Sequence, residues 1–127
     1  MAGRADYQWR EYTIQAASTS VGATPVSAYV VVPFDGEIIE SYLSTLTAIT
    51  TTDSTVTLSV LPAGVVANAV AVGGTLVATV AGAGVGKSYT AKHSSPRLVR
   101  EGDTIRFTPA GGGGAGVVGN FVVKIRR

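Results

Sequence analysis

Apolar and polar residues alternate along most of the chain with a period of two, which is the pattern of β-strands with one buried face and one wetter face. The alternation is clearest at residues 55–60, where Val56, Leu58 and Val60 are separated by Thr and Ser. A second clear case is the C-terminal stretch, whose predicted buried face is Val117, Gly119, Phe121, Val123 and Ile125.

The stretch Ala28–Leu46 contains two predicted strands and the turn between them. Tyr29–Val32 is rich in β-branched residues and ends at Pro33, and Asp35-Gly36 supplies turn chemistry. From Ile38 onward the residues are predicted to form two faces, one with Ile38, Glu40, Tyr42 and Ser44 and the other with Ile39, Ser41, Leu43 and Thr45.

The predicted strands are short and bounded by turn residues, and they cover residues 7–16, 26–32, 37–47, 55–60, 75–81, 88–93, 104–108 and 117–127. Ser18–Pro25, Gly82–Gly86 and Pro109–Gly116 are predicted loops. Val65–Val72 is predicted to be extended or irregular, because glycines bracket too few residues for a stable helix. Ile105 and Phe107 are predicted to point inward.

This series of strands, without a convincing helix, predicts an all-β chain folded as an antiparallel β-sandwich, with an eight-stranded jelly roll as the favoured type. We divide the chain into an N-terminal arm, residues 1–12, and a β-sandwich domain, residues 13–127.

Composition adds an expectation of assembly. The chain has 127 residues, the size of one domain, with 46% hydrophobic and only 14% charged residues. Part of this apolar surplus is expected to be covered by a partner. Cysteine is absent, which excludes disulfides and thiolate sites. The N-terminal residues lack the apolar core of a secretory signal, and no apolar run approaches the roughly 20 residues of a membrane span.

For each group that could carry chemistry, the sequence favours a structural role over a catalytic or binding role. Ala81–Ser88, AGAGVGKS, is close in sequence to a phosphate-binding loop. Such a loop follows a parallel strand and precedes a helix, and neither is predicted here, so the segment is interpreted as a glycine-rich surface loop. His93 is the only histidine and is expected to be exposed and structurally neutral. The carboxylate pairs Asp35/Glu37 and Glu101/Asp103 flank glycines and are predicted to form turns rather than a calcium site.

Two basic groups are present, one near residues 97–106 and one at residues 124–127. Without interleaved aromatic residues they do not predict nucleic-acid binding. They are interpreted either as solvated strand exteriors or as a surface that docks onto an acidic protein.

The residue order resembles the capsid decoration, or cement, proteins of tailed bacteriophages. The resemblance covers about Val26–Arg127. It rests on PFDG followed by an alternating stretch, on EGD followed by I-x-F within LVREGDTIRFTP, and on the terminal strand VVGNFVVKIRR.

The resemblance implies a virion structural protein. Such a jelly-roll subunit, commonly trimeric, is made in the host cytoplasm and lies on the capsid exterior, where it binds at junctions between major capsid proteins and stabilises the head. We therefore expect the major capsid protein as partner and a homo-oligomer, with a trimer favoured. We expect no enzyme activity, no cofactor, no metal, no nucleic acid and no membrane partner.

The N-terminal arm is the candidate for contacting a neighbour, because large aromatic residues and arginine anchor interfaces. Its interface candidates are Arg4, Tyr7, Trp9, Arg10 and Tyr12. The alternative for Trp9 is that it fills the end of its own sandwich.

Three other functions stay open at this point. The first is a carbohydrate- or receptor-binding jelly-roll module of a phage fibre or tail, which would need exposed aromatic residues in loops. The second is an enzyme, which would need His93 and carboxylates in one cleft. The third is a trimeric ligand of the tumour-necrosis-factor type.

Overall fold

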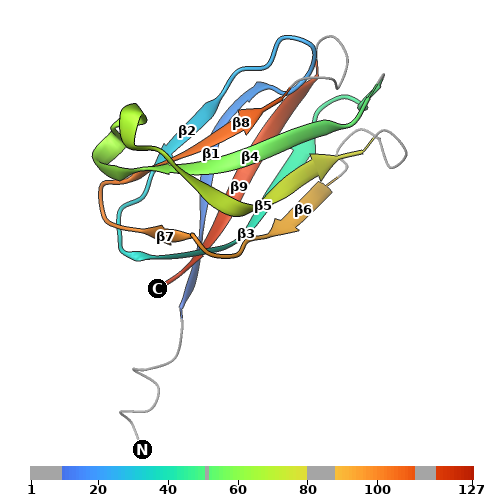
Figure 1. Ribbon diagram of the computed structural model, residues 1–127. Coiled ribbons are helices and arrows are strands. Elements are labelled where there is room, and N and C mark those ends of the chain that lie inside the picture. Colours follow the sequence, from blue (N-terminus) through green and yellow to red (C-terminus); the bar gives the residue numbers. More distant parts are fainter. Residues whose placement is uncertain (1–9, 51, 80–87, 111–116) are drawn as a thin grey trace, which may run out of the picture.

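The computed structural model describes residues 10–50, 52–79, 88–110 and 117–127, and within them the chain is built from β-strands (Figure 1). The strands are β1 (Glu11–Ser20), β2 (Ala28–Val31), β3 (Gly36–Thr45), β4 (Ser54–Leu61), β5 (Val70–Ala78), β6 (Ser88–Lys92), β7 (Leu98–Val99), β8 (Thr104–Pro109) and β9 (Val118–Arg126). Two short 3₁₀ turns, η2 (Pro62–Gly64) and η3 (Val66–Asn68), lie between β4 and β5. In this part of the chain there is no helix long and apolar enough to cross a bilayer.

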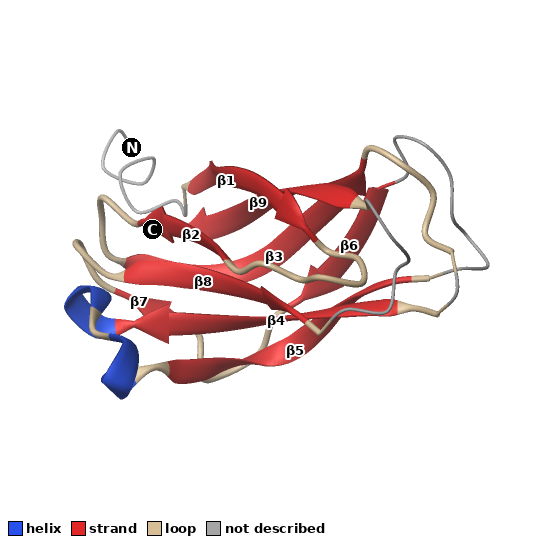
Figure 2. Ribbon diagram, turned by 90° about the horizontal axis from the view of Figure 1, so that it is seen from above, coloured by secondary structure: helices blue, strands red, loops and turns tan. Residues whose placement is uncertain are grey.

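The strands form two antiparallel sheets that pack face to face (Figure 2). Sheet A has the order β1-β9-β3-β6, with the short β7 also paired to β3, and sheet B has the order β2-β8-β4-β5. This strand order is that of a jelly roll, in which eight strands wind through two Greek keys. The predicted all-β fold, antiparallel sandwich and jelly roll are confirmed.

The two sheets also approach each other along their edges. Strand β1 packs beside β2 at one side, and β5 packs beside β6 at the other. An isolated antiparallel bridge between Gly73 and Ser94 links the two sheets at the second seam.

The core lies between the inner faces, as the alternation predicts. The Phe107 ring of sheet B stacks on the Phe121 ring of sheet A with centroids 4.8 Å apart. Ile105 is fully buried beside them. In β9 every second residue is buried, and these residues, together with the preceding Val117, are the predicted face Val117, Gly119, Phe121, Val123 and Ile125.

The predicted faces of β3 are wrong in part, because a β-bulge interrupts the strand. The register with β9 shifts between Ile38 and Glu40. Ile38 and Leu43 are therefore both buried, although strict alternation places them on opposite faces. Sequence alternation alone does not reveal the extra residue, since the shift depends on pairing with β9.

Most element boundaries differ from the prediction by a few residues, and the short strand β7 was not predicted. β5 begins at Val70 and runs through Gly73-Gly74, where a strand boundary was predicted. β1 continues to Ser20 and begins at Glu11, inside the segment assigned to the arm. The predicted loops at 82–86 and 111–116 lie outside the described residues, as does Ala81–Ser88 up to residue 87.

Candidate interaction surface

Leu98 forms an exposed apolar ridge at the end of the sandwich where β3 begins. Strand β7 pairs with β3 through Glu37–Leu98 and Gly36–Val99. Val99 enters the core with 2% of its surface exposed, so alternation turns Leu98 outward, where 71% is exposed. Leu98 is the most exposed large hydrophobic residue in the described part of the chain.

A hollow lies on each side of this ridge. The large hollow has a volume of about 570 Å³ and is lined by apolar groups of Val60, Pro62, Val70, Pro96 and Leu98, with Arg97 and Arg100 among its polar residues. The small hollow has a volume of about 330 Å³ and is bordered by Gly36, Leu98 and Val99, by the arginines Arg100, Arg126 and Arg127, and by the carboxylates Asp35 and Glu37. Both volumes are in or near the range of ligand pockets, and both hollows are open enough for a side chain to enter.

The carboxylates around the hollows are held by internal contacts. Asp103 accepts hydrogen bonds from the backbone N–H groups of Ala63 at 3.0 Å and Arg100 at 2.9 Å. Asp35 accepts one from the N–H of Glu101 at 2.8 Å. The bond from Arg100 to Asp103 is the local turn contact that was predicted, whereas the bond from Glu101 to Asp35 joins two segments distant in sequence. In the described ranges no three His, Cys, Asp or Glu side chains come close enough to hold a metal ion.

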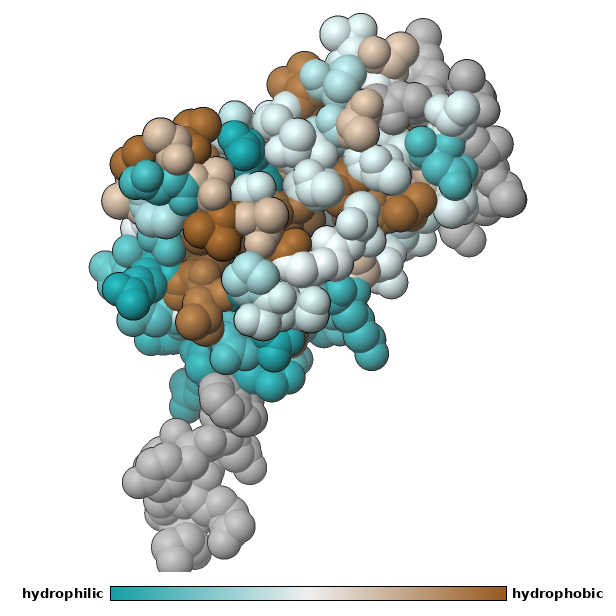
Figure 3. Space-filling view, in the orientation of Figure 1, coloured by the Kyte–Doolittle hydropathy of each residue, from teal (hydrophilic) through white to brown (hydrophobic). Residues whose placement is uncertain are grey.

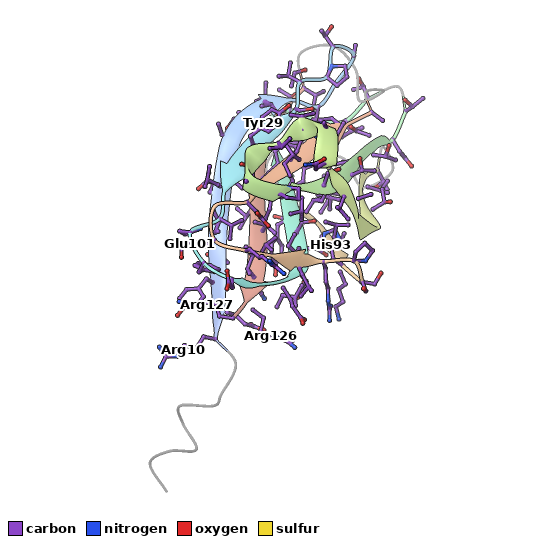
Figure 4. All side chains as sticks on the ribbon, turned by 60° about the vertical axis from the view of Figure 1, so that its left-hand side comes forward. Arg10, Tyr29, His93, Glu101, Arg126 and Arg127 are labelled. Atoms are coloured by element: carbon purple, nitrogen blue, oxygen red, sulfur yellow. The ribbon has the colours of Figure 1, made fainter. Side chains whose placement is uncertain are left out.

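Arginine side chains give this end of the sandwich its exposed charge. Arg97 pairs with Glu37 at 3.3 Å, with both side chains about one-third exposed. The Arg127 guanidinium lies 5.2 Å from the Phe34 ring centroid and 5.9 Å from that of Tyr12. Arg10, Arg126 and Arg127 lie together at this end in Figure 4.

His93 is buried, and the expectation of an exposed histidine is wrong. Only 4% of its surface is exposed. Its Nδ1–H donates to the carbonyl oxygen of Gly73 at 2.9 Å, and Nε2 therefore accepts from the Ser41 hydroxyl at 2.7 Å. Burial lowers the pKa of His93, and the hydrogen bond to Gly73 offsets part of this effect. The Ser41–His93 pair closes the seam between the sheets and lines neither hollow.

The outer face of sheet A is charged and internally paired. In the register of the sheet, Lys124 of β9 is opposite Glu40 of β3, and Glu40 is opposite Lys92 of β6. The Lys124 ammonium lies 3.7 Å from Glu40 and 4.0 Å from Glu11. The Tyr42 side chain, followed by Glu40 and Glu11, raises the pKa of Lys124.

The outer face of sheet B is almost free of charge. By register and alternation, its described outward positions are Tyr29, Val31, Thr55, Thr57, Ser59, Ala71, Thr75, Val77, Thr104, Arg106 and Thr108, of which Ser59 is only 9% exposed. Arg106 is the only charged residue among them, and its Nε is buried without a hydrogen-bond partner. Figure 3 shows this side as a pale, weakly polar surface with hydrophobic atoms gathered beside it.

The predicted interface residues are only partly placed. Arg10 is exposed at the start of β1, and Tyr12 is half-buried with its ring 5.1 Å from that of Phe34. Arg4, Tyr7 and Trp9 lie outside the described residues. Sequence reasoning missed the Leu98 ridge and the face of sheet B. The second had a signal, since residues 54–86 contain no Asp, Glu, Lys or Arg.

Comparison with known proteins gives little guidance. No protein-family model matches the chain. No curated protein matches it. Among solved structures, a CocE/NonD family hydrolase from Staphylococcus aureus is similar at 11% sequence identity and a TM-score of 0.49, over 93% of this chain and 33% of the hydrolase. The chain therefore spans about one-third of that protein's length.

The hydrolase neighbour contradicts one expectation. The sequence was interpreted as that of a protein without enzyme activity, whereas this similar structure is a hydrolase. The expectation is withdrawn on that ground. At this level of similarity the hydrolase carries no argument for an activity of the present chain.

Proposed function

We propose that this chain is a virion structural protein that binds the outside of a tailed-phage capsid, where major capsid proteins meet, and stabilises the head. The proposal joins the decoration-protein resemblance to the outer face of sheet B, on which Arg106 is the one charged residue among the described outward positions. This scarcity of charge is the observation that carries it, because the cores of protein interfaces are depleted of charged residues.

The details of this face support a docking role. Tyr29 and Val31 on the edge strand β2 are 51% and 62% exposed, and the same face carries Thr side chains, of which Thr57 and Thr75 are exposed. Such side chains lose little conformational entropy on binding and can hydrogen-bond a facing backbone or side chain. Repeated over many copies on a shell, a modest contact of this kind accumulates into strong attachment.

The lone arginine also suits this role. Among the described residues Arg106 has no ion pair, and its register neighbours Tyr29 and Ser59 carry no charge. A carboxylate of the capsid protein facing Arg106 would supply the missing partner and would fix the orientation of docking.

The carbohydrate-binding alternative is less well supported. Neither hollow has an aromatic side chain among its described lining residues. Sugar rings are usually held against aromatic faces, so the hollows do not favour a glycan.

Addition of the protein to phage heads assembled without it tests the proposal. We expect the protein to sediment with these heads and to raise the temperature at which they open. Absence of both effects would overturn the proposed function.

Matched variants test the docking face. Thr57→Lys places a charge in the middle of the outer face of sheet B and should weaken head binding about tenfold or more, because the ammonium would be desolvated without a partner. Thr90→Lys places the same charge on the outer face of sheet A and should leave binding unchanged. Both positions are exposed, so both variants should fold, which a melting curve of the free protein verifies.

A further inference from the structure

We infer that the small hollow beside Leu98 receives the Tyr7–Trp9 segment of a second copy of this chain. This inference concerns self-association and does not rest on the proposed capsid function. It uses the end of the sandwich with Leu98, whereas the proposed docking face is the outside of sheet B.

Arg10, the first described residue, lies next to a residue that lines the hollow. The Arg10 carbonyl accepts a hydrogen bond from the backbone N–H of Arg127 at 2.8 Å. Arg127 and its neighbour Arg126 line the hollow. The nine residues that precede Arg10 can span about 30 Å when extended, which is enough to reach an adjacent molecule.

The chemistry of the hollow suits an aromatic side chain. Leu98 supplies an apolar wall with 71% of its surface exposed, and Arg100, Arg126 and Arg127 border the same space. Arginine stacks on aromatic rings, and at this end Arg127 already lies over Phe34 and Tyr12. Tyr7 and Trp9 are the aromatic residues of the segment before Arg10.

Charge supports the same occupant. The Arg100 guanidinium has no ion pair or hydrogen bond with another described residue, whereas Arg97 is paired with Glu37. Asp6 lies directly before Tyr7 in the sequence and brings a carboxylate with the aromatic pair. Asp35 and Glu37 also line the hollow, but Glu37 pairs with Arg97 and Asp35 accepts from the N–H of Glu101. A docked segment would therefore place its negative group beside Arg100.

The sequence favours a second copy over the chain's own hollow. The hollow lies across β9 from the start of β1, so docking in the same molecule needs a tight reversal just before Arg10. Residues 7–10 read Tyr-Gln-Trp-Arg and contain none of the Gly, Pro, Asn or Asp residues that form such turns. Because the hollow and Arg10 lie at the same end, two or more copies that meet there can exchange segments reciprocally.

Fluorescence of the full-length protein tests the inference directly, because Trp9 is the only tryptophan. As the protein concentration rises, Trp9 emission should move to shorter wavelength, and the sedimenting mass should rise above 12.9 kDa over the same range. Leu98→Asp should abolish both changes. Leu46→Asp is the matched control, since Leu46 is a leucine that is 54% exposed at the opposite end of β3, and it should preserve both changes.

A mixing experiment separates exchange from docking within one molecule. Trp9→Ala keeps the hollow but loses the anchor, and Leu98→Asp keeps the anchor but loses the hollow. Each variant alone should stay monomeric. When Trp9→Ala is added to Leu98→Asp, the Trp9 emission of the second variant should shift to shorter wavelength and a mixed oligomer should form.

Three results would overturn the inference. The first is Trp9 emission typical of full solvent exposure at every concentration. The second is short-wavelength emission from a species of 12.9 kDa, which would mean that Trp9 packs on its own sandwich. The third is an unchanged response in Leu98→Asp.

Discussion

The outer faces of the two sheets differ in chemistry although the strands beneath them follow the same alternation. On sheet A, Lys124 lies between Glu11 and Glu40, and Lys92 extends the charged row. On sheet B, the corresponding row is Tyr29, Arg106, Ser59 and Ala71, with one charge and no ion pair. Folding of a sandwich constrains mainly the inner faces, which form the core. The outer faces are freer to differ, and we interpret their difference as a difference in what each face contacts.

The difference also fits two ways of remaining soluble. Sheet A presents paired charges, which favour water over another protein surface. Sheet B presents threonines and serines, which are polar enough for water yet cheap to desolvate. A protein that coats a large surface needs one face of each kind, and this requirement is consistent with the proposed capsid role.

The two outer faces exist only while the sheets pack together at the β5–β6 seam. We predict that substitution of Gly74 is the change at this seam that lowers folding stability most. Gly74 has φ +94°, and an added Cβ would lie 2.6 Å from the Lys92 carbonyl oxygen. Gly74→Ala should lower the free energy of unfolding by about 3 kcal/mol, since it adds a backbone clash to a left-handed conformation. Urea unfolding measures this loss.

Gly102→Ala is the matched control. Gly102 has φ +91°, and an added Cβ would meet nothing within 4 Å. It should cost only the left-handed conformation, about 1 kcal/mol. Equal losses in the two variants would mean that the seam is not tightly closed.

The same seam should make stability depend on pH through His93. Burial lowers the pKa of His93 in the folded chain, so below its ordinary value of about 6.5 the unfolded chain binds the proton more readily. The stabilising contribution of neutral His93 is complete above that pH. It should fall as the pH decreases from about 6.5 toward the lowered pKa, by at most about 1.4 kcal/mol per pH unit.

Unfolding midpoints between pH 5 and 7.5 measure this dependence. His93→Gln retains a donor and an acceptor for Gly73 and Ser41 but does not titrate, so its midpoint should change less over that range. The Arg97 guanidinium donates to the His93 carbonyl at 2.9 Å, and this backbone contact is kept in the variant. An identical pH dependence in both proteins would contradict the assignment of the titration to His93.

Local patterning was enough to predict the inner faces and the fold type. The faces of β4, β8 and β9 follow from period-two alternation, because each strand is regular along its inward residues. The jelly roll was predicted from the number and spacing of strands. The bulge at Ile38–Glu40 was not predictable in this way, because it exists only in the pairing of β3 with β9.

The parts of the surface that matter for function were harder to predict. His93 seemed exposed because its neighbours in sequence are polar, whereas its burial depends on Ser41 and on Gly73 from the other sheet. Leu98 lies in a stretch for which no strand was predicted, and its exposure follows from the two-residue pairing of β7 with β3. Arg10 and Tyr12 were predicted from the sequence as interface residues, and they lie near the small hollow. The outer face of sheet B had one signal in the sequence, which is the absence of charged residues from residues 54–86.

The smallest expected effect compares one cation from each outer face. Lys124→Met removes the ion pairs with Glu40 and Glu11 and should lower stability slightly, with a loss that shrinks at high salt. Arg106→Met removes a cation that has no ion pair with any described residue, and a buried Nε without a partner there, so stability should stay the same or rise slightly at any salt concentration. Urea midpoints at low and high salt measure both variants.

If Arg106→Met is the more destabilising change, then Arg106 serves the fold of the free chain and the lone charge on sheet B no longer points to a partner. If Arg106→Met folds normally and loses affinity for phage heads, whereas Lys124→Met keeps it, the two faces are separated by function as well as by charge.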